Sequence, residues 1–226
     1  MNDKQKQIAK DFWEEYFFNT TNNPDKDTFL YFCEDIASIP VEAKVMRFGG
    51  DTKYDVIYAD PPWKYKNVSP PCLPEKQPDT CKIEYYYETM DLQDIKNMPI
   101  KNIANKNCVL FLWATTPAIR EAFEVVDAWG FKYKTMITWE KTNRDCMGYW
   151  FRTCTEHLIV AIRGNVKAFR SMERTCYHEA RTKHSQKPQY FYELIEKVTT
   201  GKRIELFARR AIEGWDNWGN EAPKHA

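Results

Sequence analysis

Hydrophobic residues in this chain follow two patterns. Short continuous apolar runs, which are typical of buried strands, occupy residues 56–59, 107–114, 133–139, 157–163 and 203–208. Apolar residues at helical spacing, which predict amphipathic helices, occupy residues 91–98, 117–130 and 188–198. Strands without polar alternation favour a sheet that is covered on both faces. The pattern therefore predicts an α/β fold with a mostly parallel, doubly wound sheet.

The first part of the chain has a different character. The spacing of its apolar residues predicts helices over 4–18 and 27–36, and the segment is acidic and rich in aromatic residues. We expect residues 1–45 to form a small helical N-terminal extension, which packs on the edge of the main domain or on a partner. Residues 46–226 are expected to form a single globular domain.

The strand expected at 56–59 ends in Asp60-Pro61-Pro62-Trp63. Each proline fixes its own φ and lacks an N–H, and Pro62 also keeps Pro61 extended, so this backbone is stiff and rich in acceptors. The Asp60 carboxylate and the Pro61 carbonyl supply two acceptors beside the flat indole of Trp63. An amino group on a planar ring fits such a pocket. A plain strand followed by a proline turn is the alternative, and the adjoining tryptophan favours the functional interpretation.

Four segments without a clear pattern are too long to be ordinary connections, namely residues 64–87, 140–156, 164–186 and 209–226. Each follows the end of an expected strand. Ligands of open α/β sheets bind at the carboxyl ends of the strands. If the strands are parallel, these segments gather around Asp60 at one edge of the sheet, and the active site is expected there.

Composition adds little about the partner of this site. The 226 residues carry 33 basic and 32 acidic side chains, so the net charge does not indicate nucleic acid. Residues 163–187 are more basic and include His178 and His184. A basic segment of this kind can follow a phosphate backbone, or it can be an ordinary solvated loop.

Cysteine usage and hydropathy indicate the compartment. Seven cysteines without regular spacing predict reduced thiols and a cytoplasmic protein. No metal site is predicted, because the spacing of Cys146, Cys154, Cys176 and His178 gives little support for one. The sequence has neither a signal-peptide core nor an apolar run of membrane length, so we expect a soluble intracellular protein without a membrane partner.

Side chains that can hold a cofactor come from the C-terminal third of the chain. No Gly-x-Gly-x-x-Gly turn is present, so a nucleoside-like cofactor has to be bound by side chains. Lys187 can pair with Asp60 or with a ligand carboxylate, or it can be an ordinary surface lysine. Polar groups after the last expected strand suit the hydroxyls and the amino-acid end of such a cofactor, unless they form a frayed tail: Arg209, Arg210, Asn220 and Glu221.

Candidate substrate contacts lie in other segments. Asn143 and Trp150 belong to the aromatic-rich segment 141–152, whose rings can stack on an extruded base or cover the core. Glu156 can hold a substrate amine or a nearby lysine, whereas the neighbouring histidine is expected to be structural. Arg181 belongs to the basic segment and is assigned to the substrate with it.

Several short motifs occur together in a consistent order. They are Asp60-Pro-Pro-Trp63, Tyr87-Glu-Thr-Met90, Glu156-His157 with Gly164-Asn165, His184-x-x-Lys187-Pro188, Glu205-Leu-Phe-Ala-Arg209 and Gly219-Asn220. This set resembles the family of the messenger-RNA adenine-N6 methyltransferase catalytic subunit (MT-A-seventy), most of all its short bacterial and phage members. The resemblance covers about residues 54–221 and leaves the N-terminal extension unassigned.

The resemblance implies a Rossmann-like class I methyltransferase domain over residues 46–226, in a circularly permuted order where the catalytic motif precedes the cofactor strand. The implied catalytic residues are Asp60, Pro61, Pro62 and Trp63. The implied cofactor is S-adenosylmethionine, bound by Asp60, Lys187, Arg209, Arg210, Asn220 and Glu221. The residues assigned to the substrate are Trp63, Tyr87, Asn143, Trp150, Glu156 and Arg181. The animal enzymes carry glutamine in place of Glu221 and His-Asn in place of Arg210-Ala211, which weakens the likeness to the RNA-specific branch.

The expected activity is methyl transfer to the N6 amine of adenine in nucleic acid, on a base that is single-stranded or flipped out. Hydrogen bonds from the amine to Asp60 and to the Pro61 carbonyl favour a localised nitrogen lone pair, and they strengthen as positive charge develops. DNA is favoured because the chain is short and prokaryote-like. The alternatives are RNA N6-adenosine methylation, a non-catalytic nucleic-acid-binding partner subunit, and methylation of a small-molecule or protein amine. A homodimer and a heterodimer both stay open.

Overall fold

The computed structural model describes residues 52–64, 89–143, 150–169, 171–182 and 186–219. The helices expected over 4–18 and 27–36 lie outside these ranges, and so do the site residues Tyr87, Asn220 and Glu221. The helical extension over residues 1–45 and the domain boundary after it therefore stay predictions.

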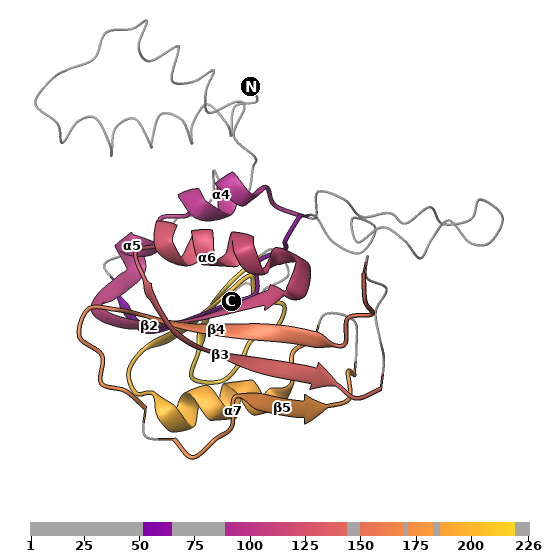
Figure 1. The fold of residues 1–226 in the computed structure, drawn as a ribbon. Coiled ribbons are helices and arrows are strands. Elements are labelled where there is room, and N and C mark those ends of the chain that lie inside the picture. Colours follow the sequence, from indigo (N-terminus) through magenta and orange to yellow (C-terminus); the bar gives the residue numbers. More distant parts are fainter. Residues whose placement is uncertain (1–51, 65–88, 144–149, 170, 183–185, 220–226) are drawn as a thin grey trace, which may run out of the picture. The chain divides into compact units, whose positions relative to one another are not determined.

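Seven strands of the described chain form one sheet in the order β5-β3-β4-β2-β1-β6-β7 (Figure 1). In chain order they are β1 (Tyr54–Ala59), β2 (Ala104–Thr115), β3 (Lys132–Lys141), β4 (Thr155–Arg163), β5 (Cys176–Glu179), β6 (Arg203–Leu206) and β7 (Asp216–Trp218). Strand β1 pairs in parallel with both β2 and β6, and the edge strands β5 and β7 pair in parallel with β3 and β6. Among the described strands, β4 alone runs antiparallel to its neighbours. The predicted mostly parallel sheet is confirmed.

Helices cover both faces of this sheet (Figure 1). Helix α7 (Gln189–Val198) lies on one face, and α4 (Leu92–Asn97) and α6 (Ile119–Ala128) lie on the other. Two short elements flank β2 in the chain, α5 (Ile100–Ile103) before it and η3 (Thr116–Ala118) after it. The two-sided cover confirms the predicted α/β architecture. None of the described helices is long and apolar enough to cross a bilayer.

The core between the sheet and α7 is strongly aromatic. Trp113 on β2 donates its indole N–H to the Tyr58 hydroxyl on β1 (2.7 Å). The Trp113 ring also meets Phe191 of α7 edge-on, with ring centroids 4.8 Å apart, and Tyr192 meets Tyr58 in the same way at 5.1 Å. Edge-to-face packing of this kind is directional as well as apolar. It fixes α7 against the strand that carries Asp60.

The turn after α7 fixes where that helix ends. The helix stops at Thr199, and Gly201 has a φ of 94°, a region that favours glycine. A Cβ at Gly201 would lie 2.2 Å from a carboxylate oxygen of Asp55 at the start of β1. The same Asp55 side chain accepts the backbone N–H of Lys202 (2.8 Å). The sequence therefore holds the C-terminal end of α7 at the start of β1, and its N-terminal end lies toward Asp60.

The antiparallel course of β4 corrects one expectation. The carboxyl ends of β1, β2, β3, β5 and β6 share one edge of the sheet, whereas β4 ends at the opposite edge. There the backbone N–H of Asn165 is bonded to the Asn107 side chain near the start of β2 (2.8 Å). Segment 164–186 therefore begins away from Asp60 and returns to it only after β5. Segment 140–156 does leave and re-enter the sheet at the Asp60 edge.

Strand positions were predicted well except for the shortest elements. Strands β5 and β7 lie inside segments that were expected to be long connections, and α5 was not predicted either. They are four, three and four residues long, and too short to leave a periodic signal in the sequence.

Candidate active site

The Asp60-Pro-Pro-Trp63 turn is held from three sides. The backbone N–H of Trp63 donates to the Pro61 carbonyl (2.9 Å), which closes a tight turn around Pro62. The Pro62 carbonyl accepts the N–H of Met90 (2.9 Å). The Trp63 indole N–H donates to the backbone carbonyl of Trp113 (3.0 Å), and the Trp63 side chain is buried. This anchoring makes the backbone around Asp60 rigid.

Buried charges surround Asp60 on the α7 side of the sheet. Lys187 lies just before α7. Its ammonium nitrogen is 2.6 Å from a carboxylate oxygen of Asp60 and 3.2 Å from one of Glu156, at the start of β4. Glu156 also pairs with Lys141 at the end of β3 (2.5 Å). The series of ion pairs Asp60–Lys187–Glu156–Lys141, hereafter the charge network, thus links the ends of β1 and β3 to the starts of α7 and β4. A surface role for Lys187 is excluded, because only 9% of its side chain is exposed.

The charges of the network shift the pKa values of Asp60, Lys187 and Glu156. Burial alone would raise the pKa of Glu156, but the ammonium groups of Lys187 and Lys141 outweigh it and hold that pKa at about 2. Burial disfavours the ammonium form of Lys187, yet Asp60 and Glu156 raise its pKa above the usual range. Burial also raises the pKa of Asp60, and Lys187 and Arg209 oppose that rise. Lys187 is therefore a permanent cation, and it favours the carboxylate form of Asp60.

A second buried carboxylate lies close to this network. Glu205 on β6 is 7% exposed and accepts the Tyr192 hydroxyl at Oε1 (2.8 Å). Within the described chain its Oε2 has no hydrogen-bond partner, and neither has the side-chain nitrogen of Asn217, which is its register partner on β7. Burial raises the pKa of Glu205 to about 7, and the charge of Asp60 adds to the rise. One acceptor and one donor are thus left unsatisfied on the same face of the sheet.

The backbone after β6 is unusual in two ways. Phe207 has a φ of 62°, which is rare and strained for a residue with a side chain. Gly219, at the end of the described chain, lies against the backbone of Ala208. A Cβ at position 219 would be 2.5 Å from the Ala208 carbonyl oxygen. Arg209 comes directly after this point, and Arg210 places its guanidinium 5.1 Å from the centroid of the Tyr192 ring. Strained backbone of this kind is concentrated at functional sites.

The residues assigned to the substrate are arranged less uniformly. Asn143 and Arg181 lie together, because the Asn143 side chain bonds the Arg181 backbone at both its N–H (2.9 Å) and its carbonyl (3.0 Å). Trp150 is 91% exposed. Glu156 has lysine partners, which was one of its two expected roles. Trp63, by contrast, packs inside the protein in this structure.

Three residues at this site were not singled out from the sequence. They are Lys141 at a strand end, Tyr192 on a helix face and Glu205 in a strand, and nothing in the local pattern marks them. Glu205 stands in the Glu-Leu-Phe-Ala-Arg motif without having been given a role. His157 has the structural surroundings that were expected. Its two ring nitrogens lie 3.1 Å from the Thr138 hydroxyl and 3.3 Å from the Thr116 hydroxyl.

Comparison with known proteins identifies the family. The MT-A70 family profile matches residues 54–221. The chain belongs to the MT-A70 family. The type II methyltransferase M.MunI of Mycoplasma sp is 32% identical over 189 residues, which cover 76% of this chain and 78% of that protein.

Eukaryotic proteins resemble the same region of the MT-A70 chain. The human N(6)-adenosine-methyltransferase catalytic subunit METTL3 is 27% identical over 180 residues, which are 75% of this chain and 28% of METTL3. A putative N(6)-adenosine-methyltransferase of Medicago truncatula is 28% identical over 179 residues, or 75% and 26% of the two chains. The match thus spans about a quarter of the eukaryotic relatives. Family and relatives together identify an adenine-N6 methyltransferase, as predicted.

Proposed function

We propose that this chain transfers a methyl group to the N6 amine of adenine in DNA, with S-adenosylmethionine as the donor. The observation that carries the proposal is the Asp60 carboxylate, which is presented at the end of β1 by an anchored double-proline turn and bound by a buried lysine. Such a carboxylate is a preorganised acceptor in a partly desolvated site. Preorganised groups of this kind supply much of the rate enhancement in enzymes.

Two acceptors of the chain are assigned to the two N–H groups of the target amine. Lys187 contacts Oδ2 of Asp60, and we assign Oδ1 to one amine N–H. The Pro61 carbonyl already accepts the Trp63 N–H, and its second lone pair is assigned to the other amine N–H. Two such bonds favour a pyramidal nitrogen and strengthen as that nitrogen becomes positive, so they favour the transition state over the ground state. Trp63 positions the turn from inside the protein, and the exposed ring of Trp150 is assigned to stacking on a base.

S-adenosylmethionine fits the polar groups beside Asp60. When bound, it supplies an electrophilic methyl group on a sulfonium centre. Glu205 offers a buried acceptor oxygen without a partner in the described chain, and the side-chain nitrogen of Asn217 opposite it offers a donor. Lys187, Arg209 and Arg210 supply positive charge for the carboxylate of an amino acid. Asn220 and Glu221 follow the tight approach at Gly219 and are assigned to the ribose hydroxyls. With these assignments the catalytic motif precedes the cofactor strand β6, which is the permuted order.

The preference for DNA follows the likeness to the type II methyltransferase M.MunI. M.MunI is 32% identical and is matched over 78% of its length, whereas METTL3 is 27% identical and is matched over 28% of its length. RNA is the second candidate, because the relatives named as N6-adenosine methyltransferases match over the same region. A nucleic acid in either case has to present its adenine outside the base stack, because a carboxylate held by a rigid turn at the edge of the sheet cannot reach the amine of a stacked and paired base.

The test is a methyl-transfer assay on four matched polymers. The protein is incubated with labelled S-adenosylmethionine and with single- and double-stranded DNA and RNA of the same sequence, and each product is digested to nucleosides. We expect the label in N6-methyldeoxyadenosine. Label in N6-methyladenosine alone would replace the DNA assignment by RNA, and no label in any polymer would favour the non-catalytic subunit.

The Asp60→Ala variant tests the site itself. It should lose methyl transfer by about a thousandfold or more while still binding S-adenosylmethionine in a calorimetric titration. Asp127→Ala, an exposed carboxylate on α6, is the matched control and should keep full activity. Near-normal turnover of Asp60→Ala would refute the assigned role of this carboxylate.

A further inference from the structure

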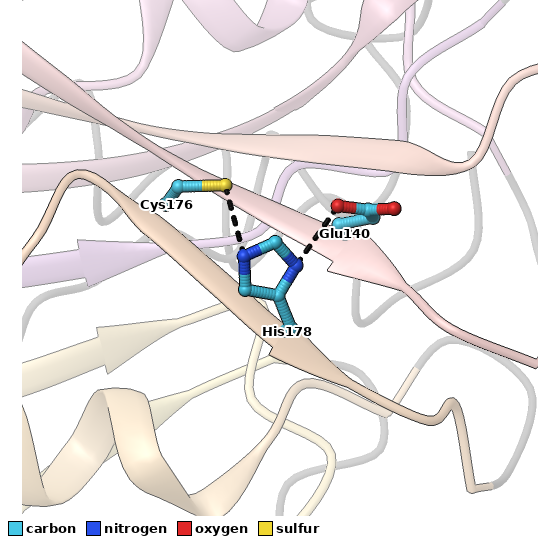
Figure 2. Close-up of side chains that lie close together, drawn as sticks. All are labelled: Glu140, Cys176 and His178. Atoms are coloured by element: carbon cyan, nitrogen blue, oxygen red, sulfur yellow. Dashed lines mark hydrogen bonds and ion pairs between the residues drawn. The ribbon is translucent and has the colours of Figure 1, made fainter.

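A cysteine, a histidine and a glutamate meet on the open part of the sheet at its β5 edge (Figure 2). Cys176 and His178 are two residues apart on β5, so their side chains point to the same face. Glu140 on β3 is the register partner of His178 in the parallel pair, which brings its carboxylate to that face as well. Adjacent strands therefore fix all three positions before any ligand binds.

The two ring nitrogens of His178 have different neighbours (Figure 2). Nδ1 lies 2.8 Å from a carboxylate oxygen of Glu140, and Nε2 lies 3.6 Å from the sulfur of Cys176. A carboxylate can only accept, so Nδ1 carries the proton in the neutral ring, and Nε2 keeps a lone pair on the side where Cys176 lies. The pair of donors that faces outward is thus one thiol sulfur and one imidazole nitrogen.

The 3.6 Å between the Cys176 sulfur and Nε2 of His178 also suits two ligands of one metal ion. Zinc bonds to sulfur at about 2.3 Å and to histidine nitrogen at about 2.0 to 2.1 Å, so tetrahedral geometry separates the two ligand atoms by about 3.5 Å. A histidine that ligates zinc commonly donates its other N–H to a carboxylate, which fixes the ring orientation and raises the ligand basicity. Glu140 stands in that outer position.

We propose that Cys176 and His178 bind a divalent transition metal ion of the zinc class, with Glu140 holding the histidine ring. On binding, the thiol proton is released to solvent, the sulfur forms the metal–thiolate bond, and Nε2 forms the second protein bond. Water completes the coordination, because both donors are on the exposed surface. Thiolate and imidazole together favour zinc-class ions over magnesium or calcium.

This site is separate from the proposed active site. Side chains alternate along a strand, so Glu140 faces away from the side on which its neighbour Lys141 joins the charge network. The proposal therefore does not depend on methyl transfer, and it can be tested by metal binding alone. A metal bound only by the folded chain would also stabilise the edge strand β5.

Cobalt is the probe of choice, because a thiolate bound to Co²⁺ gives a charge-transfer absorption band. Untagged, reduced full-length protein is titrated with Co²⁺, and Zn²⁺ is then added in competition. We expect a thiolate band that saturates at one ion per chain and is displaced by Zn²⁺. Cys176→Ser should abolish the band, and His178→Ala should weaken binding at least tenfold. Absence of a saturable band in the wild-type protein would overturn the proposal.

Two further variants separate this pair from the other cysteines. Cys154→Ser, on the residue before β4, is the matched control and should leave the titration unchanged. Glu140→Gln should weaken binding by about tenfold to a hundredfold, since it removes the carboxylate that orients the ring. A band that persists in Cys176→Ser would assign the metal to other thiols and overturn the proposal. Unchanged affinity in Glu140→Gln would overturn the role given to Glu140. Circular dichroism verifies that each variant is folded.

Discussion

Two lysines at opposite ends of α7 have the same kind of partner and very different surroundings. Lys187 lies 2.6 Å from Asp60 and is 9% exposed, whereas Lys197 lies 2.8 Å from Glu173 and is 68% exposed. The distances are nearly equal, so geometry alone does not separate the two pairs. Burial separates the two pairs. Water screens the charges of an exposed pair, whereas each charge of a buried pair depends on its partner.

The comparison explains why the charges gather at one end of the helix. At the Lys187 end, two carboxylates and a second lysine share one network. There the lysines lower the pKa of Glu156, and the carboxylates raise the pKa of Lys187. Removing a member of such a network leaves an unpaired buried charge. At the Lys197 end, water solvates the remaining charge when its partner is removed. The first arrangement holds Asp60 in one orientation, as the proposed function requires, and the second leaves the helix end in contact with solvent.

The largest expected effect comes from removing the cation at the centre of the network. Lys187→Ala leaves both Asp60 and Glu156 without their shared partner. It should lower the free energy of unfolding by about 3 to 5 kcal/mol and abolish methyl transfer. Urea denaturation and the labelled-methyl assay measure the two effects. Lys197→Ala is the matched control at the other end of α7, and it should leave both unchanged. Equal losses in the two variants would contradict the role given to burial.

The next effect is the loss of folding stability at low pH. The pKa of Glu156 is lowered from 4.5 to about 2, so the folded state keeps this carboxylate ionised at a pH where the unfolded chain has taken up a proton. The stabilisation is complete above pH 4.5 and is lost as the pH falls from there toward 2. It amounts to about 3 kcal/mol.

Glu156→Gln cannot titrate, and it tests this directly. Its free energy of unfolding should fall less steeply than that of the wild type between pH 4.5 and 2, measured by urea denaturation at each pH. Parallel pH profiles for the two proteins would mean that Glu156 is not held by Lys141 and Lys187 in solution.

The same comparison separates what the sequence predicts from what only the fold provides. Asp60 and Lys187 were both singled out from local motifs, and their pairing was one of three open roles for the lysine. They are 127 positions apart, and the sheet and α7 bring them together. Lys141 and Glu205 have no local signal, because their importance comes from the charges that tertiary structure places beside them.

Two other limits have physical causes. The antiparallel course of β4 is invisible in its sequence, since a strand that is apolar on both faces looks the same in either direction. The tryptophan of the Asp-Pro-Pro-Trp motif was assigned to the substrate, and in this structure its indole N–H donates to the Trp113 carbonyl and its ring is buried. A motif specifies which residue is present and leaves open which way it points.

The smallest expected effect is a gain in stability when Glu205 is replaced. Glu205 has its pKa raised from 4.5 to about 7, so between these values the unfolded chain is ionised while the folded chain still holds its proton. Stability therefore falls as the pH rises through this range, and the full penalty applies above pH 7. Glu205→Gln removes the penalty and can still accept the Tyr192 hydroxyl. At pH 8 it should raise the free energy of unfolding by about 1 to 3 kcal/mol.

This gain should come with a loss of function, which is what distinguishes a functional carboxylate from a structural one. Under the proposed function, Glu205 is kept in an unfavourable position because its unpaired oxygen accepts a hydrogen bond from the cofactor. Glu205→Gln should therefore be more stable than the wild type and bind S-adenosylmethionine more weakly in calorimetry. A variant that gains stability at pH 8 with unchanged affinity would leave the raised pKa in place and remove Glu205 from the cofactor site. A variant that is no more stable would contradict the raised pKa itself.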